Sequence, residues 1–586
     1  MYSTMQDVPL TVSRILEHGR KIHGASRVTT WTGDPENPRR RSFAEIGDRA
    51  AQLANALRDK LGVRQADVLG TLMWNNSEHI EAYLAVPSMG AVLHTLNLRL
   101  PVEQLVWIVN HAADRVVIVD GSLLPLLAPV LPHLPTVEHV VVSGPGDRSL
   151  LTDVDTGARV HDYEELLADR PAAFAWPELD ERQAAAMCYT SGTTGDPKGV
   201  VFSHRSIYLH SMQVNMAESM GLTDADTSLV VVPQFHVNAW GLPHATFMTG
   251  VNMLMPDRFL QPVPLAEMIE RERPTHAAAV PTIWQGLLAE VTANPRDLSS
   301  LGSVTIGGAA CPPSLMEAYD KLGVRLCHAW GMTETSPLGT MALPPAGLTA
   351  EQEWPYRVTQ GRFPASVEAR LVGPGGDVLP WDGESAGELE VRGPWIAGAY
   401  YGGSSGEALR PDDKFSADGW LKTGDVGVIT PDGYLTLTDR AKDVIKSGGE
   451  WISSVELENA LMGHPDVAEA AVVAVPDDRW GERPLATVVL KEGADADYTA
   501  LRDFLAGAGI AKWQLPERWA LVQAVPKTSV GKFDKKVIRR QFVPIFASRS
   551  TSRCCTSAFV ARSARNSTVS PDASRGSSAS SRPDAV

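Results

Sequence analysis

Apolar and polar positions alternate along the first half of the chain in runs that suit strands and helices in turn. Ser42 and Glu45 have the spacing of a capping box and stand at the start of a helical pattern over Phe43–Leu61. The runs that follow predict these elements: strands at Val68–Met73, Leu93–Asn97 and Arg115–Asp120, and helices at His79–Met89 and Val102–His111. Strands and helices that alternate in this way indicate parallel sheets with helices on both faces.

The pattern changes in the second half of the chain. Between about residues 361 and 438, short apolar runs such as Glu388–Arg392 are separated by Gly, Pro and Asp turns, which predicts a β-rich subdomain. A charged run at 439–443 marks a domain boundary. Beyond it, Ser453 caps a predicted helix and Ala470–Val475 has the apolar pattern of a strand, so a small α/β unit is expected there.

Two segments depart from ordinary globular composition. Ser228–Pro256 contains no Asp, Glu, Lys or Arg and is long enough to cross a bilayer, but Pro233 and His236, among other breaks, interrupt it. We therefore expect a buried strand, loop and helix, where an apolar pocket could be built. After Phe546 the chain is rich in Ser, Ala and Arg and has no Leu, Ile or Lys, so a disordered tail is predicted over 546–586.

Composition narrows the classes of function. The 586 residues carry a formal net charge of −16, which argues against wrapping nucleic acid. The five cysteines show neither zinc spacing nor a disulfide pattern, which fits a reducing cytoplasm. The N-terminal residues lack the basic and apolar regions of a signal peptide. We therefore expect a cytoplasmic protein with no stable membrane insertion.

The most specific segment follows a predicted strand at Met187–Thr190 and reads Y-T-S-G-T-T-G-D-P-K-G over Tyr189–Gly199. Its glycines allow several backbone N–H groups to face one anion, its Ser and Thr hydroxyls add donors, and Lys198 adds a positive charge. The spacing is not that of a Walker A loop. A flexible polar linker is a poor alternative, because linkers rarely follow a strand directly. The segment therefore predicts a phosphate-binding loop.

This loop resembles the signature loop of the adenylate-forming superfamily, which contains acyl-CoA synthetases, luciferases and peptide-synthetase adenylation domains. Further motifs of that superfamily follow in the expected order: Trp330–Thr335, Thr423–Asp425, Asp439–Lys442, Lys446–Glu450 and Pro526–Lys532. The resemblance covers roughly residues 10–545. The stretches Gln234–Trp240 and Lys446–Ser454 are especially similar to the bacterial medium- and long-chain fatty acyl-CoA synthetases.

The resemblance implies an α/β fold in which a large N-terminal domain of parallel α/β sheets plus a β-rich subdomain precedes a small, mobile α+β C-terminal domain. It also implies two half-reactions: a carboxylate attacks the α-phosphorus of ATP and releases pyrophosphate, and the thiol of coenzyme A then displaces AMP. Mobility would let the small domain serve both halves. The expected bounds are 1–438 for the N-terminal domain, 439–442 for a hinge at Lys442, 443–545 for the C-terminal domain, and 546–586 for the tail.

By resemblance, charged and hydrogen-bonding residues surround ATP. Lys532 is the expected catalytic cation between the carboxylate and the α-phosphate, Thr333 a catalytic partner of that phosphate, and Glu334 the ligand of Mg²⁺, which prefers oxygen. Thr333 and Glu334 could equally cap a helix. The residues expected to bind the nucleotide are Thr190, Ser191, Gly192, Thr193, Thr194, Gly195, Lys198, Gly308, Trp330, Gly331, Thr333, Asp425 and Arg440.

Trp330 departs from the superfamily pattern. It stands where a Tyr usually stacks on adenine, and an indole stacks at least as well but lacks the hydroxyl. The departure affects the expected nucleotide contacts and leaves the expected reaction unchanged. Asp425 is expected to accept hydrogen bonds from the ribose hydroxyls, with a turn aspartate as the structural alternative, and Arg440 to reach the ribose or the phosphates.

The remaining expected sites belong to the acid and to coenzyme A. His236, Trp240 and Gly331 are assigned to the acyl site, with His236 catalytic beside the reacting carboxylate and Trp240 as the gate of a fatty acyl tunnel. A core histidine and a core tryptophan are the alternatives. Gly448 and Gly449 are expected to line the tunnel for coenzyme A once the small domain has turned.

The sequence thus predicts an acid–thiol ligase that uses ATP, Mg²⁺ and coenzyme A to activate a medium- or long-chain fatty acid. A ligase for an aryl or short thioether acid and a luciferase-like oxygenase remain alternatives. An amino-acid adenylation domain is disfavoured, because Phe235–Asn238 contains no acid to pair with an amino group. Retention of Lys532 and Glu334 argues against a non-catalytic homologue. The length of the acid and the oligomeric state, a homodimer included, are left open.

Overall fold

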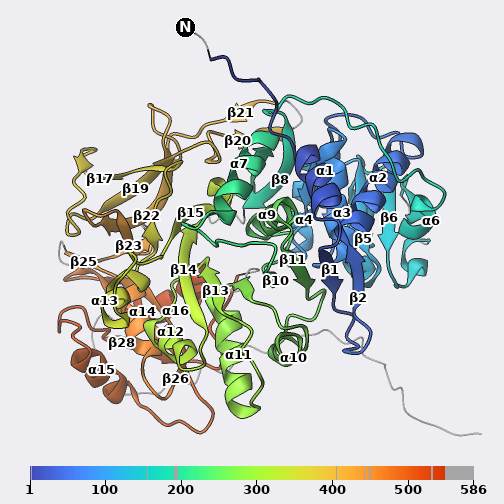
Figure 1. Ribbon diagram of the computed structural model, residues 1–586. Coiled ribbons are helices and arrows are strands. Elements are labelled where there is room, and N and C mark those ends of the chain that lie inside the picture. Colours follow the sequence, from blue (N-terminus) through green and yellow to red (C-terminus); the bar gives the residue numbers. More distant parts are fainter. Residues whose placement is uncertain are drawn as a thin grey trace, which may run out of the picture.

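The computed structural model describes residues 1–547 apart from 2, 153, 155, 191–195, 404–405, 441, 448–449 and 529–531. Two large sheets and one smaller sheet carry the fold (Figure 1). The predicted tail lies almost wholly outside the described residues. So do five residues of the predicted phosphate loop, Ser191 to Gly195, and the two glycines assigned to coenzyme A, Gly448 and Gly449.

One large sheet is built mainly from the first half of the chain. Its strands, in spatial order, are β21 (Ala408–Leu409), β20 (Tyr400–Tyr401), β9 (Lys198–Ser203), β8 (Ala184–Thr190), β4 (Val92–Thr95), β3 (Val68–Leu72), β5 (Val116–Asp120), β6 (His139–Ser143) and β7 (Arg159–Asp162). The run from β8 to β7 is parallel, whereas β9, β20 and β21 are added antiparallel. The antiparallel edge places β20, from the second half of the chain, beside the hairpin that carries the predicted phosphate loop.

The other large sheet joins the parallel and the β-rich parts of the chain. Its strands, in spatial order, are β18 (Val378–Leu379), β17 (Glu368–Val372), β19 (Gly387–Arg392), β22 (Leu421–Ile429), β23 (Tyr434–Arg440), β16 (Gly361–Arg362), β15 (Leu338–Met341), β14 (Arg325–Gly331), β13 (Ser303–Gly307), β12 (His276–Ala279), β10 (Thr227–Val230), β11 (Asn252–Met255), β1 (Arg27–Thr30) and β2 (Arg39–Ser42). In this spatial order, the strands from β14 to β1 pair in parallel. The strands from β18 to β15 pair antiparallel, and β15 is also antiparallel to β14. The β-rich segment therefore continues a parallel sheet.

Helices pack against both large sheets. The central ones are α1 (Val12–Ile22), α2 (Phe43–Asp59), α3 (Ser77–Ser88), α7 (His204–Asn215) and α9 (Leu242–Thr249); others are α4 (Val102–Ala112), α5 (Leu124–Leu127), α6 (Tyr163–Leu167), α10 (Pro262–Glu272), α11 (Pro281–Ala293), α12 (Pro313–Asp320) and α13 (Ala350–Arg357). One apolar cluster contains Leu53 of α2 and Ile80 of α3 together with Leu69 of β3 and Val230 of β10. Burial of this shared cluster holds the two sheets together.

The predicted capping box is present at the start of α2. The hydroxyl of Ser42 accepts a hydrogen bond from the backbone N–H of Glu45, and the Glu45 carboxylate accepts one from the N–H of Ser42. Two backbone donors that the helix cannot satisfy are thereby paired.

The uncharged stretch folds as buried structure, as predicted. It forms β10, a turn, α8 (Val237–Trp240), α9 and β11. Within the described residues, none of the helices combines the length and the apolar character that a bilayer crossing requires. The α8 turn is left-handed: its four residues have φ of 47°, 53°, 49° and 57°, and Gly241 follows at 77°. Non-glycine residues rarely adopt this region, and each costs about 1–2 kcal/mol there.

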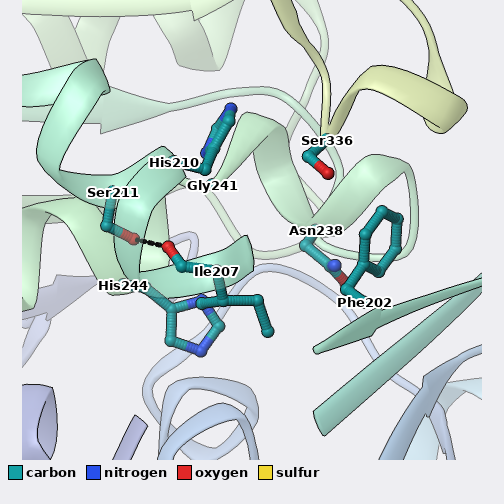
Figure 2. A pocket seen from close by; sticks show the side chains of 8 residues that line it. All are labelled: Phe202, Ile207, His210, Ser211, Asn238, Gly241, His244 and Ser336. Carbon is teal, nitrogen blue, oxygen red and sulfur yellow. Dashed lines mark hydrogen bonds between the residues drawn. The ribbon is translucent and has the colours of Figure 1, made fainter. Parts of the chain in front are cut away.

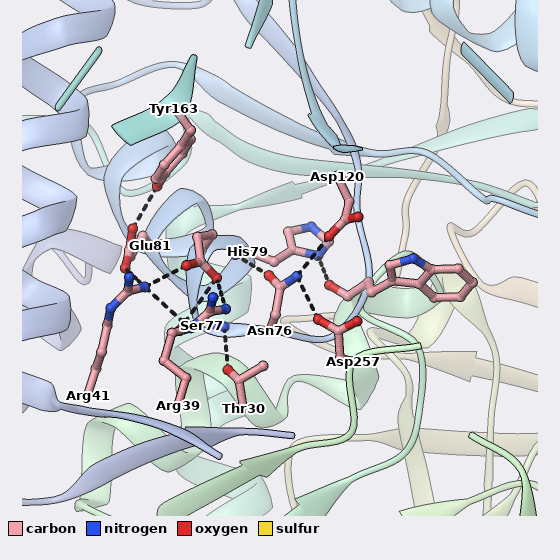
Figure 3. A network of polar contacts seen from close by, with 12 residues as sticks. Thr30, Arg39, Arg41, Asn76, Ser77, His79, Glu81, Asp120, Tyr163 and Asp257 are labelled. Atoms are coloured by element: carbon pink, nitrogen blue, oxygen red, sulfur yellow. Dashed lines mark hydrogen bonds and ion pairs between the residues drawn. The ribbon is translucent and has the colours of Figure 1, made fainter. Parts of the chain in front are cut away.

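Polar contacts at the N-terminus of α3 tie strands of both sheets together (Figure 3). The Asn76 side-chain amide donates to Asp120 at 3.4 Å and to Asp257 at 3.3 Å, and the Ser77 N–H donates to Thr30 at 3.1 Å. Asp120 ends β5 in one sheet, whereas Thr30 ends β1 and Asp257 follows β11 in the other. Beside them, Asn75 donates to the carbonyl of Val230, which ends β10, and to that of Val232 just after it, both at 2.8 Å. The segment before α8 is thus anchored to the opposite sheet.

The C-terminal elements form a small α+β unit. Its strands are β24 (Ile445–Ser447), β25 (Glu450–Ile452), β26 (Val467–Asp477), β27 (Gly481–Leu490) and β28 (Arg518–Leu521), and its helices are α14 (Ser454–Met462), α15 (Tyr498–Gly507) and α16 (Lys535–Ala547). Figure 1 shows these elements, orange to red, next to α12 and α13. The Asp439 carboxylate accepts from the N–H of Ser454 at 2.7 Å, so β23 is joined to the start of α14.

Candidate active site

Lys532 reaches from the C-terminal unit to the end of β13. A Cβ atom on Gly308, which has a φ of 81°, would lie 3.5 Å from Cε and 3.9 Å from Nζ of Lys532. A Cβ here would be in ordinary van der Waals contact with the lysine, and it is the positive φ that favours glycine at this position. Burial, and next the Arg440 guanidinium, lower the pKa of Lys532 to about 8, while Asp425 and Glu334 act in the opposite direction. The charges of these three predicted site residues therefore act on the Lys532 ammonium.

His236 lies close enough to Lys532 to respond to its charge. Burial, and next Lys532, lower the pKa of His236 to about 3, so the imidazole is neutral near pH 7. A neutral imidazole beside a cation can accept or donate one hydrogen bond without adding charge. The role of His236 beside the reacting carboxylate stays a prediction.

The carboxylate of Asp425 is held from two sides. Trp330 donates its indole N–H to Oδ2 at 2.8 Å, and Nε of Arg440 lies 3.2 Å from Oδ1. Asp425 and Arg440 are direct partners in the pairing of β22 with β23. Each carboxylate oxygen has a second lone pair, so hydroxyl donors can still bind. The indole N–H thus gives Trp330 a contact with Asp425 that a stacking role alone did not predict.

Glu334 lies in a short 3-10 turn, η4 (Thr333–Thr335), together with Thr333, and neither residue caps a helix. Tyr400 donates its hydroxyl to Oε1 of Glu334 at 2.7 Å. The Lys198 ammonium lies 5.0 Å from the centre of the Tyr400 ring. No hydrogen bond to Oε2 of Glu334 is found among the described residues, and a carboxylate oxygen of this kind suits a hard cation such as Mg²⁺.

Of the residues predicted for the acyl site, Trp240 lies on the left-handed turn and His236 directly precedes it. The far edge of the Trp240 indole, Cη2, lies 3.5 Å from where a Cβ of Gly307 would stand. Trp240 is 8% exposed and belongs to the main apolar cluster. Trp240 and Lys532 therefore lie near two successive glycines, Gly307 at the end of β13 and Gly308 directly after it.

A small cavity of about 10 Å³ lies beside the α8 turn (Figure 2). His210, Asn238 and Gly241 contribute to its lining. It has room for about one water molecule. A Cβ on Gly241 would lie 2.6 Å from Nδ1 of His210, so the turn is packed directly against α7.

Other predicted residues lie at the edges of this arrangement. Thr190 ends β8 and pairs with Lys198 across the hairpin. Gly331 ends β14, where an added Cβ would collide with the carbonyl of Pro337. The predicted hinge residue Lys442 accepts a hydrogen bond from Arg539 of α16 through its carbonyl at 3.4 Å. Tyr400 was not identified from the sequence, because nothing in its spacing marks it as more than a strand residue.

Sequence profiles match both parts of the chain. One described as AMP-binding enzyme matches residues 22–401, and one described as AMP-binding enzyme C-terminal domain matches residues 456–532. The profile matches and the mixed α/β architecture confirm the predicted superfamily and fold class.

Relatives and a solved structure extend the match over nearly the whole chain. The 3-methylmercaptopropionyl-CoA ligase of Ruegeria pomeroyi is 45% identical over 547 residues, which cover 92% of this chain and 99% of the relative. The long-chain-fatty-acid–CoA ligase of Thermus thermophilus is 41% identical over 545 residues, which cover 92% and 97%. An anthranilate CoA ligase, AuaEII, solved with anthranoyl-AMP, aligns with a TM-score of 0.80 and 25% identity over 93% of this chain and 100% of that chain.

The named acids of these proteins differ, so the predicted medium- or long-chain fatty acid is not confirmed. What they share is the ligation of a carboxylic acid to coenzyme A. With the matched profiles and the assembled site, this chain belongs to the family of AMP-binding enzymes and is an acyl-CoA ligase that works through an acyl-adenylate.

Proposed function

We propose that this ligase activates a carboxylic acid with a short, uncharged tail, of the kind named for the Ruegeria relative, 3-methylmercaptopropionate. The observation that carries the proposal is the position of Trp240, whose indole lies against Gly307 while Lys532 lies against Gly308. If the tail of a carboxylate held at Lys532 runs past Gly307, the Trp240 indole limits its length. A short tail fits such a site, and the neutral His236 adds no charge to it.

The proposed chemistry assigns each half of the reaction to named residues. A carboxylate oxygen attacks the α-phosphorus of ATP, the bond to the bridging oxygen breaks, and pyrophosphate leaves with that electron pair. The Lys532 ammonium would lie between carboxylate and α-phosphate, where negative charge accumulates. Asp425 and Arg440 would hold the ribose, and Thr333 and Lys198 the phosphates. Because phosphoryl transfer depends on positioning and charge, these contacts supply most of what it needs.

Mg²⁺ would be held by Glu334, together with phosphate oxygens, and would neutralise part of the charge on the phosphates. In the second half, the sulfur of coenzyme A attacks the acyl carbon and the bond to AMP breaks; the thiol proton leaves to solvent. Gly448 and Gly449 would line the path of the thiol, and Lys442 would be the point about which the small domain turns.

A medium- or long-chain fatty acid is the second candidate. The Thermus relative acts on long-chain acids at 41% identity, and the apolar surroundings of Trp240 could house a chain if the indole moved. In the described arrangement the indole is buried and held by the left-handed turn.

A panel of acids distinguishes the two candidates. AMP release that depends on coenzyme A would be measured with 3-methylmercaptopropionate, butyrate, hexanoate, octanoate, palmitate and benzoate. We expect kcat/KM to be highest for 3-methylmercaptopropionate or an acid of similar length, and to fall from hexanoate to palmitate. A maximum at octanoate or beyond would refute the short-acid proposal, and a maximum at benzoate would point to an aryl acid.

A further inference from the structure

We infer that Tyr400 is a positioning residue for adenylation: it orients the Glu334 carboxylate and keeps it apart from Lys198. This inference rests on the proposed role of Glu334 and does not depend on which acid is activated. Tyr400 is 3% exposed, and its hydroxyl donates to Oε1 of Glu334 at 2.7 Å. Both partners are buried, since Glu334 is 6% exposed. A hydrogen bond to a buried charged group is stronger than one between neutral groups.

The backbone around Tyr400 is held by the 3-10 turn that carries Glu334 and by the phosphate-loop hairpin. On one side, the N–H of Ala397 donates to the carbonyl of Glu334 at 2.7 Å. On the other, Tyr401 pairs with Gly199 where β20 joins β9. The short segment that leads to Tyr400 therefore follows the 3-10 turn of Glu334 and then enters the sheet beside the phosphate-loop hairpin. Tyr400 therefore lies where the Glu334 turn and the phosphate-loop hairpin meet.

The ring of Tyr400 also contacts the cation of that hairpin. Lys198 Nζ lies 5.0 Å from the ring centre, within the range of a cation–π contact. Among the described residues, no ion pair joins Lys198 to Glu334. The phenol thus stands between a lysine and a glutamate that would attract each other at closer range. With the ring in place, Lys198 is left for phosphate and Oε2 of Glu334 for a cation.

The phenol hydroxyl is the group that engages Oε1 of Glu334, at 2.7 Å. Groups that orient a metal ligand in this way are commonly needed for full metal affinity.

The test compares Tyr400→Phe with Tyr401→Phe, a matched control whose ring faces His111 at 5.5 Å. Three quantities are measured with any acid the wild type accepts: the Mg²⁺ dependence of ATP–pyrophosphate exchange, the affinity for ATP in Mg²⁺ by calorimetry, and thioester formation from supplied acyl-adenylate. For Tyr400→Phe we expect the Mg²⁺ concentration at half-maximal exchange to rise roughly tenfold. ATP binding in Mg²⁺ should weaken in parallel, and thioester formation should be unchanged. Tyr401→Phe should match the wild type.

A double-mutant cycle with Glu334→Gln tests whether Tyr400 acts through Glu334. The double variant should require no more Mg²⁺ than Glu334→Gln alone. A wild-type Mg²⁺ dependence in Tyr400→Phe, or an equal loss in both half-reactions with a lower Tm, would overturn the inference. If Glu334→Gln itself leaves the Mg²⁺ dependence unchanged, the assignment of Glu334 falls as well, so the two failures can be told apart.

The removal of the ring gives an independent result. In Tyr400→Leu the separation of Lys198 from Glu334 is lost along with the hydrogen bond. We expect this variant to bind ATP more weakly than Tyr400→Phe even at saturating Mg²⁺, because Lys198 can then pair with the glutamate. Equal ATP affinity of the two variants at saturating Mg²⁺ would contradict the separating role of the ring.

Discussion

Lys532 places a positive charge among residues of both signs at the boundary between the two parts of the chain. The charges of Arg440, Asp425 and Glu334 act on its ammonium, and its side chain passes Gly308. If Lys532 serves only the first half-reaction, Lys532→Ala should lose acyl-adenylate formation by several orders of magnitude. Conversion of supplied acyl-adenylate to thioester should remain within about tenfold of wild type, as measured in separate assays of the two halves. An equal loss in both halves, with the fold intact, would refute the assignment.

The charge of Lys532 also predicts a pH dependence. Because its pKa is lowered to about 8, the free enzyme loses the ammonium as pH rises through 8. We expect kcat/KM for adenylation to fall above that pH, by about tenfold per pH unit in the limit. Lys532→Arg, whose charge does not titrate in this range, should abolish the fall even if its rate is lower. A profile that stays flat to pH 10 in the wild type would contradict the expectation.

Trp240 is the residue whose replacement should change the choice of acid. Trp240→Ala removes the ring that lies against Gly307, so we expect the maximum of the acid panel to move toward longer chains. The cavity should also lower the free energy of unfolding by about 3–5 kcal/mol. Leu287→Ala, in the separate core around α11, serves as a control of similar kind and should be destabilised without a change in the acid profile. A destabilised Trp240→Ala with the wild-type profile would identify Trp240 as a core residue only.

Single residues differed in how far the sequence could identify them. Roles for Lys532, Glu334 and Asp425 could be predicted because each lies in a short motif that resembles one of the superfamily, and these roles stay predictions. The contacts of Trp330 with Asp425 and of Tyr400 with Glu334 could not be assigned. Each joins positions 66 or more residues apart, and their meeting depends on how distant strands are ordered in the sheets.

At the scale of secondary-structure elements, the α8 turn is the least ordinary piece of the molecule. Four successive residues other than glycine have positive φ, in a segment whose two ends are held by Asn75 and by Gly241. Strain of this kind persists only where surrounding contacts enforce it, and it is common at functional sites. Here it directs Trp240 toward Gly307 and places His236 just before the turn.

Gly241 provides a test of that turn. Its φ of 77° disfavours any L-residue, and a Cβ would also collide with His210. Gly323 has the same φ, but a Cβ there would meet nothing within 4 Å. We expect Gly323→Ala to lower the free energy of unfolding by about 1 kcal/mol. Gly241→Ala should lower it by about 2–4 kcal/mol and should also change the acid profile. Thermal unfolding and the acid panel measure the two effects. Equal effects on stability and an unchanged profile would show that the packing of His210 against the turn does not matter.

Elements whose apolar residues recur with the period of a helix or a strand were predictable, and this turn was not. The helix after Ser42, the strands β3 and β5 and the cap of α14 follow from hydrophobic period and capping residues, which act locally. Val237, Ala239 and Trp240 carry no local preference for a left-handed conformation. Their backbone is set by contacts from other elements, so the sequence around them indicated only an interrupted apolar stretch.

At the scale of the whole molecule, the two sheets meet at a pair of acidic residues. Asp257 lies near Asp120, with the Asn76 amide between them (Figure 3). Burial, and next Asp120, raise the pKa of Asp257 to about 6 from its ordinary value of 3.8. The folded state thus favours the protonated carboxyl. The stability this gives is present in full below about pH 4 and is lost as pH rises through 6.

Asp257→Asn should therefore stabilise the protein at pH 7.5 and have less effect at pH 5. The gain at pH 7.5 should be on the order of 2–3 kcal/mol, seen as a higher Tm. Asn tolerates the positive φ of 52° at this position. Asp169, exposed and with a φ of 59°, gives a control in Asp169→Asn that should change Tm little at either pH. A gain that is the same at pH 5 and 7.5 would show that charge at Asp257 is not its cause.

The continuity of the sheet that runs from β2 to β18 has a consequence for redesign of the enzyme. Gly307, Trp330, Asp425 and Arg440 all lie on its strands, so a ladder of backbone hydrogen bonds fixes their spacing. Trp240 lies on α8, which is outside that ladder. On the proposed assignment of these residues, a library of variants in α8 and α9 should vary the acid while the geometry around the nucleotide stays constant. New acid specificities should be reached through few substitutions in this short segment, without a matching search for variants that restore ATP use.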